Sequence, residues 1–208
     1  MHDVLEQKLR AGIDRLQLTL DETAIQGLMA YLNGLIKWNK AYNLTAVRDP
    51  EQMVVKHLLD SLSILPFVQA RSVIDVGTGG GMPGMVLAIT RPGVAVTLLD
   101  SNGKKTRFLK QMAAELKLAN VTVVHSRVEE FDGRYEIVTS RAFASLADML
   151  NWCAHLVAPG GCFLAMKGLV PLDEIKALPA GYAVTATDAL SVPFLDEERH
   201  LVRIEPLA

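Results

Sequence analysis

The chain has 208 residues, 50% of them hydrophobic, and a formal net charge of -2. This length allows one well-buried domain with a small extension and is too short for two ordinary enzyme domains. The nearly balanced charge provides no global attraction for nucleic acid, so a polyanion-binding surface must come from local clusters of Lys and Arg.

The N-terminal part of the chain is predicted to be helical. Thr19-Leu20-Asp21-Glu22 fits a capping box, and apolar residues then recur at helical spacing. Asp49 and Pro50 provide an N-cap and a first-position proline for a further helix, which ends before Pro66. We therefore predict a helical extension over residues 1–66 that packs on a main domain of residues 67–208.

Beyond Ser72, short apolar runs alternate with helical segments. The strands are expected at 72–76, 94–100, 121–126, 135–143 and 162–168, with helices near 84–90, 104–118 and 145–157. This alternation is typical of a doubly wound, mostly parallel sheet that helices cover on both faces. Two later runs, near 181–187 and 200–206, are expected to complete the sheet as a hairpin.

The two cysteines, Cys153 and Cys162, are too few for a disulfide framework and lack the C-x-x-C spacing of zinc or redox sites. We expect buried thiols and no metal centre. The chain shows neither a signal-peptide pattern nor an apolar run near the ~20 residues of a membrane span. A cytoplasmic protein without a membrane partner is the expectation.

Residues 74–84, IDVGTGGGMPG, contain five glycines at the first strand-to-helix turn. In a doubly wound sheet this turn lies at the carboxyl edge, where glycine lets the main chain approach a ligand and free helix N–H groups can bind its polar end. Asp100 closes the next strand, where a carboxylate can accept both hydroxyl protons of a ribose. Gly77, Gly79 and Asp100 thus predict a nucleotide-like ligand; tight helix-strand packing is the alternative.

Two details favour S-adenosylmethionine over a dinucleotide as this ligand. Asp75 stands two residues before the first glycine, where its carboxylate would attract the amino-acid end of S-adenosylmethionine or orient the loop, and would repel a pyrophosphate. The remaining chain is also too short for the substrate domain of a usual dehydrogenase. After the third strand, Val128 can pack on an adenine ring and Glu129 can accept its amino proton, unless Glu129 only opens a helix.

The fourth strand ends in SRAFAS, without the acidic or amide residue, prolines and aromatic residue that grip an exocyclic amine. Methylation of guanine N7 needs only alignment of a free lone pair, so a site without a general base is consistent with it. His57, Asp60 and Ser61 superficially resemble a hydrolytic triad, but they share one short helix and lack a nucleophile elbow. A hydrogen-bond cluster that joins domains and recognition of a substrate both remain open for them.

Basic residues gather near the predicted ligand edge. Residues 101–110 contain four of them and no acid, so that Lys104, Lys105 and Arg107 can contact phosphates while Phe108 faces the core; a solvated helix face is the alternative. Arg141, at the end of the fourth strand, can pair with the methionine carboxylate or hold a phosphate or base edge. Lys167, at the end of the fifth strand, has a comparable position.

Several motifs occur together over nearly the whole chain: YNLTAVRDP, KHLLDSL, IDVGTGGGMPG, LLDSNGKK, SRVEEF, SRAFASL and MKG. In order and spacing they resemble the RsmG family, also called GidB, of bacterial 16S ribosomal RNA methyltransferases. The resemblance implies a Rossmann-like class I fold that uses S-adenosylmethionine, and a guanine N7 acceptor in the decoding region. The residues that it implies in the cofactor pocket are Gly77, Met82, Val128, Glu129 and Arg141, with Asp100 at the ribose.

The same motifs place further residues at the substrate. Asn43 and His57 are expected in the acceptor wall and Arg127 at the RNA, while Arg141 positions the cofactor or the base without a general base. The expected partner is 16S rRNA, in the small subunit or an assembly intermediate, with a monomeric enzyme. The rival hypotheses are a nicotinamide oxidoreductase, a non-catalytic ribosome-binding module and a small-molecule methyltransferase.

Overall fold

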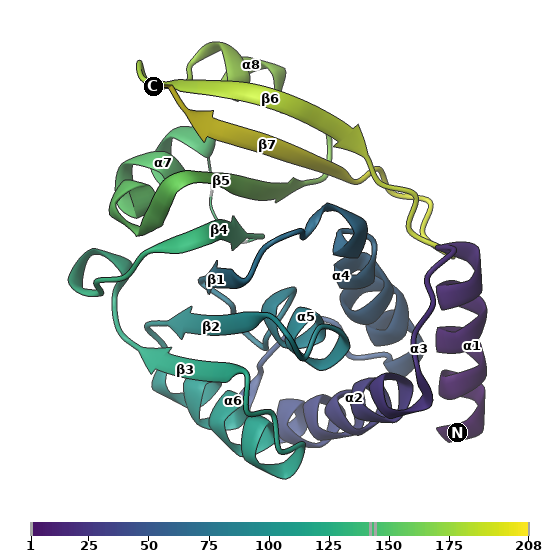
Figure 1. Ribbon diagram of the computed structural model, residues 1–208. Helices are drawn as coiled ribbons and strands as arrows, with labels where there is room; N and C mark the ends of the chain where they lie inside the picture. The colour runs from purple at the N-terminus through teal and green to yellow at the C-terminus, as the bar shows by residue number, and fades with distance from the viewer. Residues whose placement is uncertain (1, 142, 144, 208) are drawn as a thin grey trace.

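A computed structural model describes residues 2–141, 143 and 145–207 of the chain, and its centre is a seven-stranded sheet (Figure 1). The strand order is β3-β2-β1-β4-β5-β7-β6, and β7 runs antiparallel to both of its neighbours. The strands are β1 (Ser72–Val76), β2 (Ala95–Asp100), β3 (Val121–His125), β4 (Tyr135–Ser140), β5 (Val157–Lys167), β6 (Tyr182–Ala189) and β7 (His200–Pro206). The predicted mostly parallel sheet and its final hairpin are confirmed.

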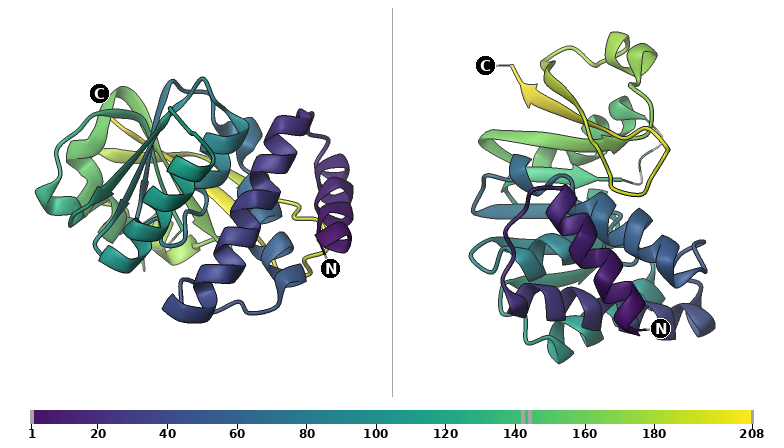
Figure 2. Two further views of the ribbon diagram at one scale, coloured as in Figure 1. Left: turned by 90° about the horizontal axis from the view of Figure 1, so that it is seen from below. Right: turned by 90° about the vertical axis from the view of Figure 1, so that its right-hand side faces the viewer.

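Helices cover both faces of this sheet (Figure 2). On one face, α5 (Gly84–Thr90) and α6 (Gly103–Glu115) share a hydrophobic core with the N-terminal helices. On the other face, α7 (Leu146–Cys153) buries Leu146 and Leu150 against Val138 and Phe163 of the sheet, and α8 (Leu172–Lys176) lies beyond it. Among the described residues, no helix combines the length and the apolar character needed to cross a membrane.

The N-terminal helices pack against the α5 and α6 side of the sheet. They are α1 (His2–Arg15), α2 (Glu22–Tyr42), α3 (Pro50–Met53), η1 (Val54–Leu59), α4 (Asp60–Leu62) and η2 (Leu65–Phe67). The N-cap of α2 is Asp21, whose side chain accepts a hydrogen bond from the Ala24 N–H, so the predicted capping box at Thr19 was placed two residues early. Asp49 and Pro50 begin α3 as predicted.

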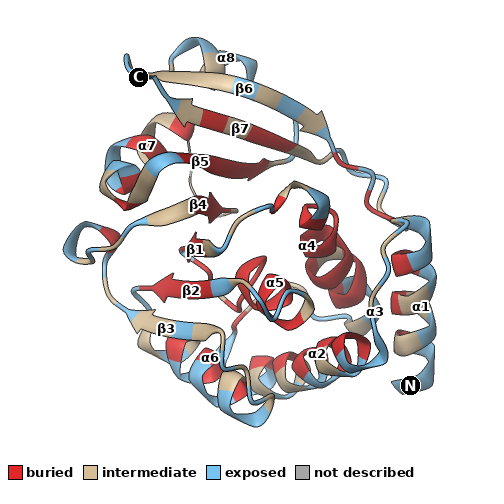
Figure 3. Ribbon diagram, viewed as in Figure 1, coloured by how far each residue is buried: buried red, intermediate tan, exposed pale blue. Residues whose placement is uncertain are grey.

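The segment from α3 to α4 contains a π-helical stretch, η1, that is almost wholly buried (Figure 3). The Asp60 N–H bonds the carbonyl of Val55, five residues earlier, instead of the carbonyl of Lys56. The Lys56 carbonyl accepts a hydrogen bond from Arg141, at the end of β4. Such bulges widen a helix and release a carbonyl for a tertiary partner.

Residues 190–199, between β6 and β7, reach from the sheet to the N-terminal helices (Figure 1). Leu190 and Val192 are buried in the same core as α1 and α2. The Arg15 guanidinium lies 4.3 Å from the centroid of the Phe194 ring, a cation-π contact. This connection carries Arg199 to the carboxyl edge of the sheet.

Candidate active site

A cavity of about 560 Å³ opens at the carboxyl edge of β1, β2 and β3, where a doubly wound sheet binds ligands. Its lining residues are Val76, Gly77, Leu99, Asp100, Ser101, Ser126, Arg127, Val128, Glu129, Phe143, Asp148 and Trp152. Five residues that the sequence assigned to the cofactor or the RNA therefore meet in one cavity: Gly77, Asp100, Arg127, Val128 and Glu129.

The glycines after β1 have two different structural roles. Gly77 lines the cavity and has a φ of 67°, in the left-handed region where a side chain is strained. At Gly84, by contrast, an added Cβ would lie 2.3 Å from a methyl group of Leu98 and 2.8 Å from Asp75. The ligand and the packing explanations thus each account for part of the glycine run.

The first N–H groups of α5 are already used by the protein. The Gly84 N–H donates to Asp75 Oδ2 at 2.8 Å, and the Met85 N–H donates to the Gly81 carbonyl at 2.7 Å. Gly84 and Met85 therefore offer no free N–H group to a ligand. The loop folds back on its own preceding strand and satisfies them.

Asp75 is completely buried and lies outside the cavity. Its Oδ2 also accepts a hydrogen bond from Thr78 Oγ1 at 2.7 Å, so both of its partners belong to the glycine loop. Burial raises the pKa of Asp75 to about 6, although the hydrogen bonds from Thr78 and Gly84 oppose the shift. Of the two roles considered for Asp75, these contacts favour orientation of the loop.

Asp100 faces the cavity with its carboxylate held by main-chain donors. Oδ2 accepts from the Gly79 N–H and Oδ1 accepts from the Asn102 N–H, each at 2.8 Å. A carboxylate oxygen has two lone pairs, so each oxygen keeps one acceptor site for a ribose hydroxyl. Gly79, which was predicted to bind the cofactor, does not line the cavity; its N–H fixes the Asp100 carboxylate.

The opposite wall of the cavity combines an apolar residue with aromatic rings. Val128 is buried and Glu129 is exposed beside it, while Phe143 and Trp152 meet edge to face with 5.7 Å between ring centroids. Sequence reasoning missed Trp152 and Asp148, four residues apart on α7. Their spacing places them on one helix face and was a usable signal.

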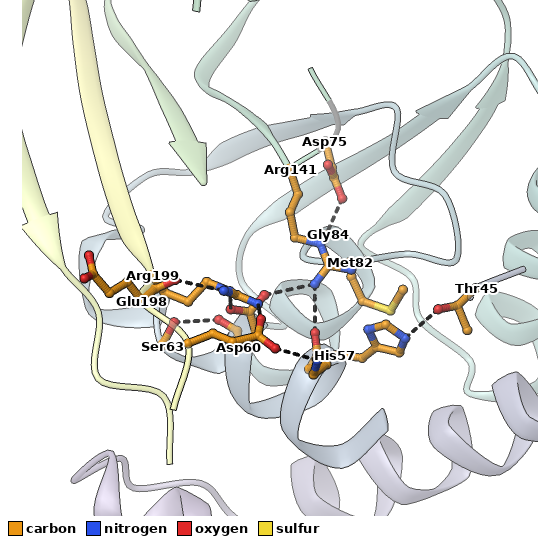
Figure 4. Close-up of polar contacts among 12 residues, drawn as sticks. Thr45, His57, Asp60, Ser63, Asp75, Met82, Gly84, Arg141, Glu198 and Arg199 are labelled. Carbon is orange, nitrogen blue, oxygen red and sulfur yellow. Dashed lines mark hydrogen bonds and ion pairs between the residues drawn. The ribbon is translucent and has the colours of Figure 1, made fainter. Parts of the chain in front are cut away.

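Arg141 lies in a cluster of charges on the β4 side of the edge (Figure 4). Its Nη1 donates to the Lys56 carbonyl and to Asp60 Oδ2, both at 2.9 Å. Arg199 Nε lies 3.3 Å from the other oxygen of Asp60, which is only 2% exposed. A single buried carboxylate therefore holds two arginines. No local pattern in the sequence indicated Arg199, because its partner lies far along the chain.

A second, smaller hollow of about 270 Å³ adjoins this cluster. It is lined by Asp60, Arg141, Met166, Lys167, Gly168, Leu190, Arg199 and His200. Lys167 Nζ is paired with Glu174 Oε2 at 2.9 Å. The hollow is therefore lined mainly by cations, and the carboxylates of Asp60 and Glu174 neutralise part of their charge.

Three other predicted residues, His57, Asn43 and Met82, line neither hollow. His57 is buried with Nε2 2.8 Å from Thr45 Oγ1, and burial, together with the nearby Arg141, lowers its pKa to about 4. Asn43 is the left-handed C-cap of α2 and accepts a hydrogen bond from Arg48. Met82, within the glycine loop, is buried.

The HLLDS residues do not form a hydrolytic triad. The Ser61 hydroxyl is buried without a hydrogen-bond partner among the described residues, and His57 bonds Thr45 instead. Asp60 joins η1 and α4 to β4 through Arg141, and to the β7 side through Arg199. These contacts favour the domain-joining cluster over direct substrate recognition.

The basic residues after β2 lie on α6, which Asn102 caps through the N–H groups of Lys104 and Lys105. Lys104 and Arg107 are exposed, Lys105 is half-buried, and Phe108 faces the core as predicted. Within the described ranges, no ion pair involves any of these cations. They present a basic surface next to the cavity edge.

The strand order, the glycine turn and the carboxylate that closes β2 define a Rossmann-like class I S-adenosylmethionine-dependent methyltransferase. The family described as GidB, rRNA small subunit methyltransferase G, has a model that matches residues 24–202, and the chain belongs to this family. The family implied by the sequence motifs is therefore confirmed, and a nicotinamide oxidoreductase is excluded.

Curated relatives match nearly the whole chain. Ribosomal RNA small subunit methyltransferase G of Neisseria gonorrhoeae (strain NCCP11945) is 53% identical over 199 residues, which cover 95% of this chain and 96% of the relative. The protein of the same name from Pseudomonas aeruginosa (strain LESB58) is 55% identical over 198 residues, which cover 94% of this chain and 92% of the relative.

Solved structures support the fold at much lower identity. Ribosomal protein L11 methylase from Lactobacillus delbrueckii subsp. bulgaricus has a TM-score of 0.56 at 16% identity, over 72% of this chain and 77% of that chain. M. jannaschii TYW2, in complex with AdoMet, has a TM-score of 0.57 at 14% identity, over 72% of this chain and 76% of that chain. At such identities the likeness shows the fold alone.

Proposed function

We propose that this chain transfers a methyl group from S-adenosylmethionine to N7 of a guanine in the decoding region of 16S ribosomal RNA. The observation that carries the proposal is membership of the family over residues 24–202, joined to a cavity with the expected carboxylate at the end of β2. The two relatives described above, of which this chain covers 96% and 92%, are named Ribosomal RNA small subunit methyltransferase G.

The residues of the cavity fit this cofactor. Asp100 accepts hydrogen bonds from the two ribose hydroxyls, and Gly77 lets the main chain approach the ligand. Val128 packs on the adenine, and Glu129 accepts a hydrogen bond from its amino group. Two further candidates, Phe143 and Trp152, enclose the ring from the α7 side. When bound, S-adenosylmethionine supplies a methyl group activated by a sulfonium centre.

Methylation of guanine N7 requires the enzyme only to position the base against the methyl group. Guanine N7 carries a free lone pair and no proton, so the chain must align that lone pair with the methyl group and exclude water. Arg141 lines the second hollow, two residues before the cavity residue Phe143, and its fork can hold the base edge or the cofactor carboxylate. No proton transfer is assigned to any side chain.

The RNA surface is assembled from cations on three elements. Lys104 and Lys105 start α6, Arg127 lies at the cavity mouth, and Lys167 lies at the end of β5. Phosphate contacts of this kind set affinity and make it fall with salt. We propose that the enzyme acts as a monomer in the cytoplasm, on the small subunit or on an assembly intermediate.

The test is methyl transfer from radiolabelled cofactor to small subunits whose RNA lacks the modification. We expect label at one guanine, and chain cleavage there after borohydride and aniline treatment, which detects N7-methylguanine. The same assay on naked 16S rRNA, at two salt concentrations, compares the substrates. RNA binding without any label would indicate a non-catalytic module, and neither binding nor label would favour a small-molecule acceptor.

A further inference from the structure

Tyr31 connects the N-terminal helix α2 to the glycine loop. It is completely buried, and its ring stacks on Phe108 with 6.2 Å between centroids. Its hydroxyl donates a hydrogen bond to the Gly80 carbonyl and lies 3.1 Å from Met82 Sδ. Burial raises the pKa of Tyr31, so the hydroxyl stays protonated and remains a donor at neutral pH.

The loop is therefore held from two sides at consecutive residues. The Gly79 N–H donates to Asp100, the residue assigned to the ribose, and the Gly80 carbonyl accepts from Tyr31. Gly79 and Gly81 both have positive φ values, of 60° and 102°. Glycines in this region move freely unless tertiary contacts fix them, so these two bonds select one loop conformation.

Close packing leaves the loop little room to move toward α2. A Cβ added at Gly81 would lie 3.0 Å from the Tyr31 hydroxyl, and one added at Gly80 would lie 3.3 Å from Leu35 of the same helix. The N–H groups of Gly81 and Met82 both bond the Thr78 carbonyl. The Tyr31 hydroxyl ties this turn to the helical extension through its hydrogen bond to the Gly80 carbonyl.

We propose that Tyr31 is a positioning residue for cofactor binding, acting through Gly80 on the loop that holds Asp100. The helical extension would then be part of the cofactor site, although none of its residues lines the cavity. This inference rests on the proposed function, because it assumes that the cavity receives S-adenosylmethionine.

The test is Tyr31→Phe, which keeps the ring and removes only the hydroxyl. We expect the Kd for S-adenosylhomocysteine and the KM for S-adenosylmethionine to rise about fivefold to tenfold, with the KM for RNA within twofold. Hydrogen exchange should quicken at the amides of residues 79–82 and stay unchanged in β5. Isothermal titration calorimetry and exchange mass spectrometry measure these quantities.

Thr90→Val is the matched control, since it removes a hydroxyl that donates to the Val86 carbonyl at 2.8 Å, at the far end of α5. It should lower stability without changing cofactor affinity. Equal affinity in wild type and Tyr31→Phe, with unchanged exchange in the loop, would overturn the inference and leave the proposed function standing. Absence of S-adenosylhomocysteine binding to the wild type would overturn both.

Discussion

Two carboxylates are almost completely buried near the carboxyl edge of the sheet, and their partners differ in charge. Asp75, beneath the glycine loop, is held by the neutral donors Thr78 Oγ1 and Gly84 N–H. Asp60, beside the second hollow, is paired with the guanidinium groups of Arg141 and Arg199. The exposed fractions are similar, 0% and 2%, so the comparison isolates the effect of the partners.

The difference distinguishes the glycine loop from the second hollow. The hydrogen bonds from neutral donors do not compensate fully for the loss of hydration, so the pKa of Asp75 is raised. The ionised carboxylate that anchors the loop therefore destabilises the folded protein. Asp60 instead pairs with two cations, and so brings together arginines from the end of β4 and from the segment before β7. The glycine loop is thus fixed by hydrogen bonds from neutral donors, and the second hollow by paired charges; in the proposed function these are the cofactor half and the acceptor half of the site.

Asp60→Asn should have the largest effect. The variant leaves Arg141 and Arg199 without their shared counter-charge, so we expect the free energy of unfolding to fall by roughly 4 kcal/mol. Denaturant unfolding measures it, with Glu136→Gln as the control, because Glu136 pairs with an exposed arginine and should matter far less. An equal fall in the free energy of unfolding in the two variants would contradict the expectation that the buried Asp60 pairs matter more than an exposed ion pair.

Asp75→Asn should remove a pH-dependent destabilisation that the wild type carries. The pKa of Asp75 rises from 3.8 in the unfolded chain to about 6 in the native protein, so the native state binds the proton more tightly. The free energy of unfolding of the wild type should therefore fall as the pH rises from 4 to 6, by at most about 3 kcal/mol, and stay at the lower value above pH 6. The variant lacks this step.

Unfolding of both proteins at pH 4, 5, 6 and 7 checks this prediction. The stability of the variant relative to wild type should rise across the range, whatever its absolute value at pH 4. A flat difference would mean that the Asp75 carboxylate is not destabilised by its burial.

Arg141→Ala should have the smallest energetic effect and should separate the two halves kinetically. We expect kcat/KM for RNA to fall about 30-fold, or about 2 kcal/mol, because the fork no longer positions the acceptor or the cofactor carboxylate. If Arg141 serves the base, the Kd for S-adenosylhomocysteine stays within threefold. Arg134→Ala, at the opposite end of β4, is the control, and full activity of Arg141→Ala would remove Arg141 from the site.

Most of the sheet could be predicted, because alternating apolar runs and glycine turns are local signals. The errors lie where tertiary pairing overrides composition. β5 begins at Val157 instead of 162, although Pro159, Gly160 and Gly161 disfavour a strand, because Val157 pairs with Tyr135 across an irregular register. β4 ends at Ser140, which leaves Arg141 just beyond the strand.

By itself, the sequence determined the order of the elements, the family and the position of the cavity after β1 and β2, because a glycine turn and the acid closing the next strand are set by neighbouring residues. Only the tertiary structure decided which charges meet. Arg141 and Asp60 are 81 residues apart, and Tyr31 and Gly80 are 49 apart. Such pairs form because packing brings distant segments to one edge, and no local pattern in the chain specifies which donor will meet which acceptor there.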